Sequence, residues 1–147
     1  MLVISEKSTE IKNKAYIMSE IHKIHQQLMN KEITCAKLVQ DRLELLKLNS
    51  HNTVNSLLDE TALVLAKKVD AKIESGEEIG LLEGIPFGIK DVYMVQGTYT
   101  TASSDLLKKY KASYTATAIQ KLLDAGAIPL VKENCDSFGH GSSSENT

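Results

Sequence analysis

Two short apolar runs separated by a helical pattern constrain the fold of this chain more than any other feature. In the first run, Ile85 to Ile89, apolar residues alternate as they do in a β-strand. The second, Ala127 to Val131, is a short continuous apolar run that also indicates a strand. Between them, Thr115 is placed to cap a helix that Gly126 ends. A strand, a helix and a strand in this order predict a βαβ unit with two parallel strands and a right-handed crossover.

Both prolines of the chain fall inside these two predicted strands. Proline has no N–H to donate, so Pro86 places the first strand at an edge of the sheet or lies at that strand's own start. Pro129 removes one ladder hydrogen bond from the second strand. Both positions therefore predict local departures from a regular sheet.

The first half of the chain has helical periodicity. Three helices are predicted, each next to a capping residue: Ser19, Thr34 and Asp59. The third helix should end near Gly76, where a glycine commonly follows a helix, and an extended piece is expected at Val54 to Leu58. Residues 1–18 lack a clean period and are interpreted as a loose N-terminal arm, which leaves 19–147 as the domain. The glycine- and serine-rich end after the second strand indicates that this α/β domain is incomplete.

Composition narrows the class of protein. The 147 residues, 42% hydrophobic and 24% charged, suit one globular domain. A net charge of −2 argues against a nucleic-acid-binding face on this segment. Cys35 and Cys135 show no metal-ligand spacing, so we expect no metal site and a reducing compartment. No basic region followed by an apolar stretch opens the chain, and no run approaches the roughly 20 residues of a membrane span. A cytoplasmic protein is therefore expected.

Lys90 is the first candidate for chemistry, because it ends the first predicted strand, at the edge where α/β proteins place their sites. A lysine in a desolvated spot loses affinity for its proton and can act as a base. The alternative reading is a strand-end lysine that simply reaches solvent.

The segment from Gly139 to Ser144 is the second candidate. Successive backbone N–H groups in a glycine-rich turn can stabilise an anion, although a flexible polar loop is the alternative. A phosphate-binding loop is not indicated, since no Gly-Lys-Ser/Thr follows a strand. Of the four histidines, His140 is the one most suited to face a pocket, because it lies between two glycines. His22 and His25 lack a partner at metal-binding offsets.

Four ordered blocks resemble the amidase-signature family. Residues 82–91 read Leu-Glu-Gly-Ile-Pro-Phe-Gly-Ile-Lys-Asp, similar to the family's L-x-G-I-P-x-x-[IV]-K-D block. Thr-Thr-Ala-Ser at 100–103 resembles its TT-x-S loop, and residues 114–132 resemble its A-G-A and lysine block. Residues 134–146 are similar to N-x-D-E-F-A-M-G-S-S-T-E-N. The likeness runs from about Ser19 to the end of the chain.

The resemblance implies that this chain carries the N-terminal helices and the first βαβ part of a mixed, mostly parallel amidase-signature sheet. It also implies that Lys90 is the catalytic base, acting through a bridging serine on a nucleophilic serine. Both of those serines belong to blocks downstream of Thr147, so Ser142 to Ser144 are not the catalytic ones. On the same grounds His140, Gly141 and Ser142 are expected near the amide-binding pocket.

The last block is typical of the glutaminase subunits of tRNA-dependent amidotransferases. This likeness implies glutamine hydrolysis, with the ammonia passed to a partner and used on Glu-tRNA(Gln). It further implies B and C subunits, ATP and magnesium used by the full complex, no cofactor on this segment and no membrane. The segment alone is expected to be inactive. A hydrolase of the same family acting on a small amide, and a non-catalytic interaction module, remain the alternatives.

The sequence departs from the family pattern at several positions. The departures are Thr115 for Asp, Val131 for Gly, Glu133 for Thr, Ser137 for Glu and His140 for Met. Thr115 can still cap a helix, but it lacks the carboxylate that favours a helix N-terminus.

Overall fold

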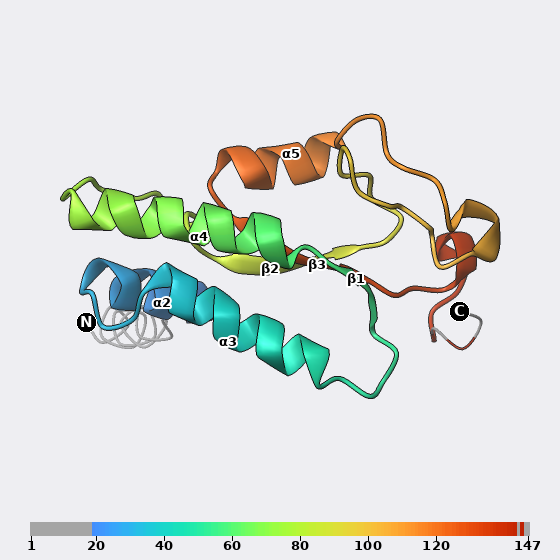
Figure 1. Ribbon diagram of the computed structural model, residues 1–147, viewed down its shortest axis with the longest axis horizontal. Coiled ribbons are helices and arrows are strands. Elements are labelled where there is room, and N and C mark those ends of the chain that lie inside the picture. The colour runs from blue at the N-terminus through green and yellow to red at the C-terminus, as the bar shows by residue number, and fades with distance from the viewer. Residues whose placement is uncertain (1–18, 144, 146–147) are drawn as a thin grey trace, which may run out of the picture.

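The computed structural model describes residues 19–143 and 145, so the predicted arm at 1–18 lies outside the described residues, as does Ser144. The helices are α2 (Glu20–Met29), α3 (Cys35–Lys47), α4 (Asp59–Glu74) and α5 (Thr117–Asp124). The strands are β1 (Val54–Leu57), β2 (Pro86–Lys90) and β3 (Ile128–Glu133). Two short 3-10 helices, η1 (Asp105–Leu107) and η2 (Ser137–Gly139), lie in the loops at one end (Figure 1).

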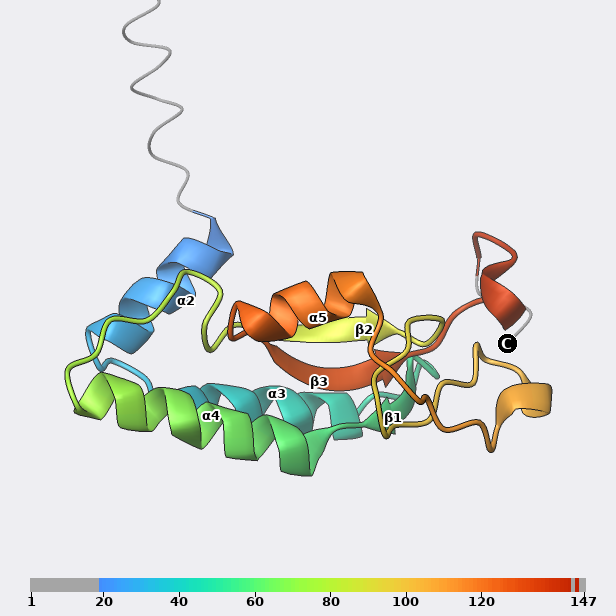
Figure 2. The same ribbon diagram turned by 90° about the horizontal axis from the view of Figure 1, so that it is seen from above.

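The strands form one mixed sheet in the order β1-β3-β2. β2 and β3 are parallel and are joined through α5, which confirms the βαβ prediction. β1 pairs with β3 in the antiparallel sense, so the extended piece predicted at 54–58 is a strand of the same sheet. Figure 2 shows α3 and α4 together on one side of the sheet and α5 on the other. The fold class predicted from the sequence is confirmed.

The main core lies between the sheet and the pair α3 and α4. α4 is one helical layer of this core, and Ala62, Ala66 and Val69 present its buried side. Ile128, Leu130 and Val131 supply the strand side of the same cluster. Small alanines on α4 let the helix approach closely, and the larger side chains of the strand fill the space between. The strands whose carboxyl ends carry the candidate site residues are therefore packed directly against this core.

Two predicted helix caps are confirmed. Ser19 and Thr34 accept hydrogen bonds from His22 N and Lys37 N at the starts of α2 and α3. Gly76, with φ +82°, follows the C-cap of α4 as expected. α3 has a further cap that the sequence does not reveal: the carboxylate of Asp70 accepts from Cys35 N at 2.6 Å and Ala36 N at 2.9 Å.

Two other cap predictions are wrong. Asp59 is the first residue of α4, whose N-cap is Leu58 with no side-chain hydrogen bond. Thr115 does not cap α5, because its hydroxyl accepts from Gln96 N at 3.0 Å in the preceding loop. The helix therefore begins two residues later, after an Ala116 cap that has no side-chain acceptor.

Pro129 lies in the central strand of the described sheet, a position where proline is rarely tolerated. The ladder adjusts around it: Phe87 pairs with Pro129, but the next pair is Gly88 with Val131, so Leu130 is skipped. Such a β-bulge accommodates the missing N–H and changes which face the following residues occupy. Pro86 is the first residue of β2, as predicted.

Candidate functional site

The sequence-predicted site residues lie at one end of the molecule. β2 and β3 end there, and the loop 91–116 and the segment 134–143 extend beyond the sheet at that end (Figure 1). Carboxyl ends of parallel strands are where α/β proteins place binding and chemistry. The order of elements thus brings Lys90 and His140 to the same end.

Lys90 is the last residue of β2, and its side chain is exposed in this chain. It pairs with Glu133 across the parallel ladder, so the two side chains leave the same face of the sheet. The desolvation that would make a lysine a base is therefore not supplied by the described residues. The role of Lys90 stays a prediction.

The buried lysine at this end is Lys132 rather than Lys90. Its side chain is 0% exposed, and its ammonium lies 2.7 Å from Oδ1 of Asp91, which is 1% exposed. The approach lies outside the directions of a well-formed hydrogen bond to Oδ1, so the contact is an ion pair. Lys132 also donates to Thr100 Oγ1 at 3.1 Å and to Tyr99 O at 3.4 Å. Removing one partner of a buried pair leaves an uncompensated charge and costs about 3–5 kcal/mol.

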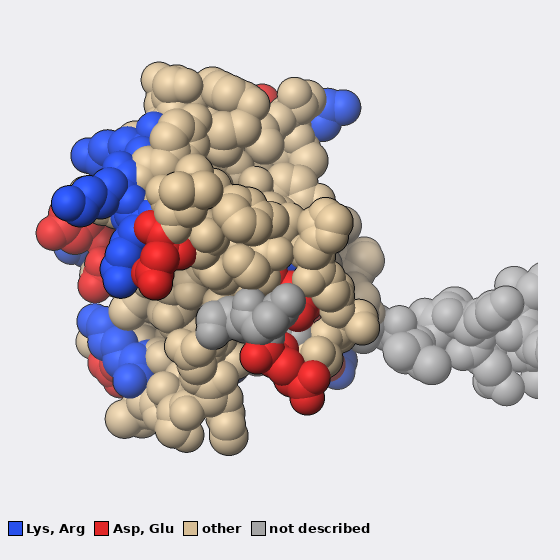
Figure 3. Space-filling model, turned by 90° about the vertical axis from the view of Figure 1, so that its right-hand side faces the viewer, with Lys and Arg blue, Asp and Glu red and all other residues tan. Residues whose placement is uncertain are grey.

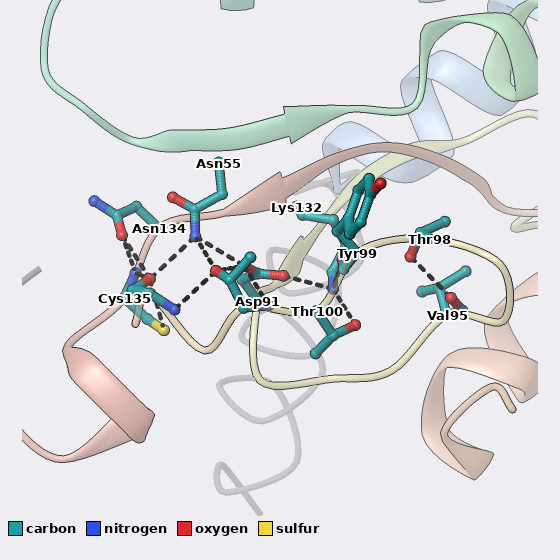
Figure 4. A network of polar contacts seen from close by, with 11 residues as sticks. Asn55, Asp91, Val95, Thr98, Tyr99, Thr100, Lys132, Asn134 and Cys135 are labelled. Carbon is teal, nitrogen blue, oxygen red and sulfur yellow. Dashed lines mark hydrogen bonds and ion pairs between the residues drawn. The ribbon is translucent and has the colours of Figure 1, made fainter. Parts of the chain in front are cut away.

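Asp91 joins the end of β2 to the loop at 100–103 (Figure 4). Its Oδ2 accepts from the hydroxyl of Thr101 at 2.5 Å, from the backbone N–H of Thr101 at 3.1 Å and from Asn55 Nδ2 at 2.9 Å. Its carbonyl accepts from Ala102 N at 3.1 Å. Hydrogen bonds to an ionised acceptor are among the stronger ones in proteins, so this carboxylate anchors the loop.

Ser103 connects the same loop to the residues after β3. Its hydroxyl donates to Asn134 Oδ1 at 2.6 Å and accepts from Cys135 N at 3.0 Å. Ala102 and Ser103 both have positive φ, 47° and 51°, a backbone region that few residues other than glycine adopt. Phe138 N then donates to Ala102 O at 2.8 Å. The loop is thus held from two sides in a conformation it would not adopt alone.

The predicted amide-pocket segment follows η2. His140 is exposed, and its N–H donates to Ser137 O at 3.1 Å. Gly141 has φ +143°, and a Cβ on it would lie 2.5 Å from the carboxylate of buried Asp136. Gly139 lies beside Val92, with its Cβ position 3.4 Å from Val92 Cγ1. The segment that carries the glycines therefore packs beside the residues that directly follow Lys90 and Asp91.

Glu133 and Gly88 occupy one space on the Lys90 face. A Cβ added to Gly88 would lie 1.9 Å from Oε1 and 2.5 Å from Cδ of Glu133. The carboxylate of Glu133 therefore lies directly over Gly88. The departure at Glu133 from the family's Thr is matched by a glycine that leaves room for the longer side chain.

A polar hollow of about 560 Å³ lies beside the network. It is lined by Asn55, Ser56, Tyr99, Thr101, Ser103 and Asn134, among others. Neither Lys90 nor the predicted pocket segment lines it. Seen from this end, most of the surface is uncharged, most of the Lys and Arg side chains lie at the left margin, and a few carboxylates lie nearer the middle (Figure 3). Exposed aromatic rings, among them Tyr93, Tyr110 and Phe138, contribute to the uncharged surface of the loops.

Reasoning from the sequence places Asp91 and Lys132 at the carboxyl ends of the two predicted strands, but it does not predict their ion pair and does not single out Asn55. A lysine directly after four apolar strand residues was the available signal for Lys132, because a charged residue in that setting needs a buried partner. Asn55 carries no such signal, since its role depends on the antiparallel pairing of β1. Among the described residues no three His, Cys, Asp or Glu side chains are grouped to hold a metal ion. Within residues 19–143 and 145, no helix combines the length and hydropathy needed to cross a bilayer.

The arrangement defines an α/β segment with a polar network at the carboxyl ends of two parallel strands, the setting of many enzyme sites. The sequence pattern of the Amidase family matches residues 36–147. The chain belongs to this family, whose members carry the amidase signature.

Curated relatives of this chain narrow the comparison from the family to one kind of subunit. The chain is 47% identical over 133 residues to the A subunit of the glutamyl-tRNA(Gln) amidotransferase from Gloeothece citriformis. It is 46% identical over 135 residues to the corresponding subunit from Nostoc punctiforme. Each match covers 88% of this chain but only 27% of the relative, so the chain spans about a quarter of their length. The structure of a peptide amidase from Stenotrophomonas maltophilia matches with 26% identity and a TM-score of 0.72, covering 84% of this chain and 26% of that one.

Proposed function

We propose that this chain is the N-terminal part of the glutaminase subunit of a glutamyl-tRNA(Gln) amidotransferase and that it supplies the base, Lys90. The observation that carries the proposal is the identity of 46–47% with two such subunits over 88% of the chain. The position of Lys90 at the carboxyl end of β2, two residues before the Val92 that lies against Gly139, supports it.

In the proposed reaction, the neutral amine of Lys90 accepts a proton from a bridging serine. That serine in turn takes the proton of the nucleophilic serine, whose oxygen attacks the side-chain amide carbon of glutamine. The bridging serine then gives one proton to the leaving nitrogen and regains its own from Lys90, so ammonia departs and leaves an acyl-enzyme, which water hydrolyses to glutamate. Both serines lie downstream of this chain. Backbone N–H groups, to which the turn from His140 to Ser142 contributes, stabilise the oxyanion.

The ammonia passes to a B subunit, which uses ATP and magnesium to amidate Glu-tRNA(Gln), and a C subunit completes the complex. This segment holds no cofactor in the proposal, and the complex works in the cytoplasm. Lys90 is exposed in this chain, so the proposal requires that the downstream part covers it. Burial then disfavours the charged ammonium and leaves the amine free to accept a proton.

A chimera tests the proposal. Residues 19–147 replace the corresponding part of the glutaminase subunit from Gloeothece citriformis, which is co-expressed with its B and C subunits. We expect glutamine hydrolysis and formation of Gln-tRNA(Gln). Lys90→Ala should lower kcat for glutamine hydrolysis by about 10²–10⁴-fold, because a positioned base contributes that much. Lys121→Ala is the matched control, since Lys121 is an exposed lysine on α5.

The proposal fails if the active chimera keeps its rate after Lys90→Ala. Turnover of small amides without any response to the B subunit would instead favour an amidase of the peptide-amidase kind. The isolated 147-residue chain should not hydrolyse glutamine, because the nucleophile lies downstream of it. Clear turnover by the chain alone that Lys90→Ala abolishes would contradict this expectation.

A further inference from the structure

Two buried charges hold three separate segments at the end of the sheet. Asp91 directly follows β2, Lys132 lies near the end of β3, and the loop at 99–103 supplies most of their remaining partners. Neither charge is accessible to solvent, at 1% and 0% exposure. The pair is too enclosed to bind a ligand, so its contribution lies in the segments that it holds.

The pair can set the position of Lys90 without touching its side chain. Successive residues along an extended backbone point to opposite faces, so Lys90 and Asp91 leave β2 on opposite sides. The ladder register agrees, because Lys90 pairs with Glu133 and Ile89 pairs with Lys132. Asp91 N also donates to Glu133 O at 2.9 Å. Fixing Asp91 therefore fixes the backbone from which the exposed Lys90 extends.

Hydrogen bonds of the loop at 99–103 connect the ion pair to the residues just before the predicted pocket segment. The Asp91 carbonyl accepts from Ala102 N at 3.1 Å, and the Ala102 carbonyl accepts from Phe138 N at 2.8 Å. Ser103 accepts from Cys135 N at 3.0 Å. These bonds depend on the positive φ of Ala102 and Ser103, which the Asp91 and Lys132 contacts to Thr100 and Thr101 help to maintain.

We propose that Asp91 and Lys132 are positioning residues. Their ion pair orders the loop at 99–103 and thereby sets the place of Lys90 relative to the segment from His140 to Ser142. The ordering role stands on the contacts alone, whereas its catalytic meaning rests on the proposed function.

Amide hydrogen exchange of the 147-residue chain, followed by NMR, tests the ordering role. The reporter amides are those of Ala102, Cys135 and Phe138, and the reference amides are those of Val39 in α3 and Ala66 in α4. In Lys132→Met and Asp91→Asn, the three reporters should exchange about tenfold faster or more, because the loop opens locally. Lys132→Arg keeps a cation in place and should retain most of the protection.

The double variant Asp91→Asn/Lys132→Met keeps the test decisive if the single variants unfold, because it leaves no unpaired buried charge. We expect it to fold, with fast exchange confined to the three reporters. Unchanged reporters in the folded double variant would overturn the proposal. So would equal acceleration of the reporters and the references, or failure of the double variant to fold, because either result shows a role in overall stability alone.

The chimera tests the catalytic meaning. In it, the double variant should lower kcat for glutamine hydrolysis at least about tenfold with KM changed less than about threefold, because the loss affects alignment rather than binding. The chimera with Lys132→Arg, which keeps a cation beside Asp91, should retain a kcat between those of the parent chimera and the double variant. If the loss of activity is matched by an equal loss of active enzyme, so that kcat per active site is unchanged, the result would contradict a positioning role. An inactive chimera would count against the proposed function, and the exchange measurements on the chain would still decide the ordering role.

Discussion

Gly88 of β2 lies under the carboxylate of Glu133, which leaves no room there for a side chain. Glu133 fills the space of the missing Cβ, and the contact involves the far end of a flexible side chain. Sequence comparison shows Glu133 only as a departure from Thr, because the pairing of β2 with β3 is what brings it over Gly88. The two residues form one local unit that the order of residues alone does not reveal.

We therefore expect Gly88→Ala to have different consequences in two backgrounds. The Glu133→Thr background removes Oε1 and Cδ, the two atoms nearest to the Cβ position, so there alanine should stabilise the strand by about 0.5–1 kcal/mol, the usual cost of a glycine in a strand. With Glu133 present, the displaced carboxylate should cancel that gain. The measurement is a double-mutant cycle from urea unfolding. Equal effects in both backgrounds would show that Glu133 does not lie over Gly88 in solution.

The buried thiol of Cys35 makes stability depend on pH. Burial, together with the charge of Asp70, raises the pKa of the Cys35 thiol from its ordinary 9.0 to about 12. Above pH 9 the unfolded chain loses this proton while the folded chain keeps it, so stability falls as pH rises from about 9 to about 12. The urea midpoint should decline over this window, and the decline should be smaller in Cys35→Ala. An identical decline in both proteins would assign the effect to other groups.

At the scale of the elements, the start of α3 is stabilised by a residue from another helix. Asp70 of α4 accepts from the first two amides of α3, a favourable place for a carboxylate because of the helix dipole. Thr34 is recognisable as a cap from its position before an apolar stripe. Asp70 is not, because only the packing of α4 against α3 brings it there.

Asp70→Ala should lower the free energy of unfolding by about 1–2 kcal/mol, because it removes the acceptor of two helix-terminal amides. Asp70→Asn keeps one acceptor oxygen and should cost less. Asp124→Ala, which changes an exposed aspartate on α5, serves as the control and should fall within about 0.5 kcal/mol of the parent. Urea unfolding checks all three, and a loss for Asp70→Ala no larger than that of the control would refute the cap.

The wrong caps at Asp59 and Thr115 have a common physical cause. Both residues have good capping side chains, but local chemistry does not decide where the helices begin. Thr115 is already used by Gln96 N, and α4 begins directly after a β1 that is paired with β3. Tertiary contacts move each helix start by one residue while leaving the helices themselves where periodicity places them.

At the scale of the whole molecule, the sequence was sufficient for the βαβ unit and for the end of the sheet where Lys90 and His140 lie. These follow from periodicity, glycines and the order of elements. The buried ion pair could not be predicted with its partners, because Asp91, Lys132 and Asn55 come from three strands or strand ends that only the sheet order β1-β3-β2 brings together. The sequence also does not show what covers Lys90 in the proposed function, because this chain spans about a quarter of the relatives' length.

The skipped residue in β3 has a consequence for how this gene can change. Because Leu130 has no partner on β2, the side chains after it are shifted by one place, and Lys132 lies on the face of Asp91 rather than on that of Ile128. In-frame loss of the Leu130 codon would remove the position that is unpaired on the β2 side and leave Lys132 opposite Ile89 and Glu133 opposite Lys90. In a regular strand the same loss would turn every later side chain to the other face. The bulge therefore means that loss of this one codon would keep the buried lysine on its face of the sheet, while the core would lose the Leu130 side chain.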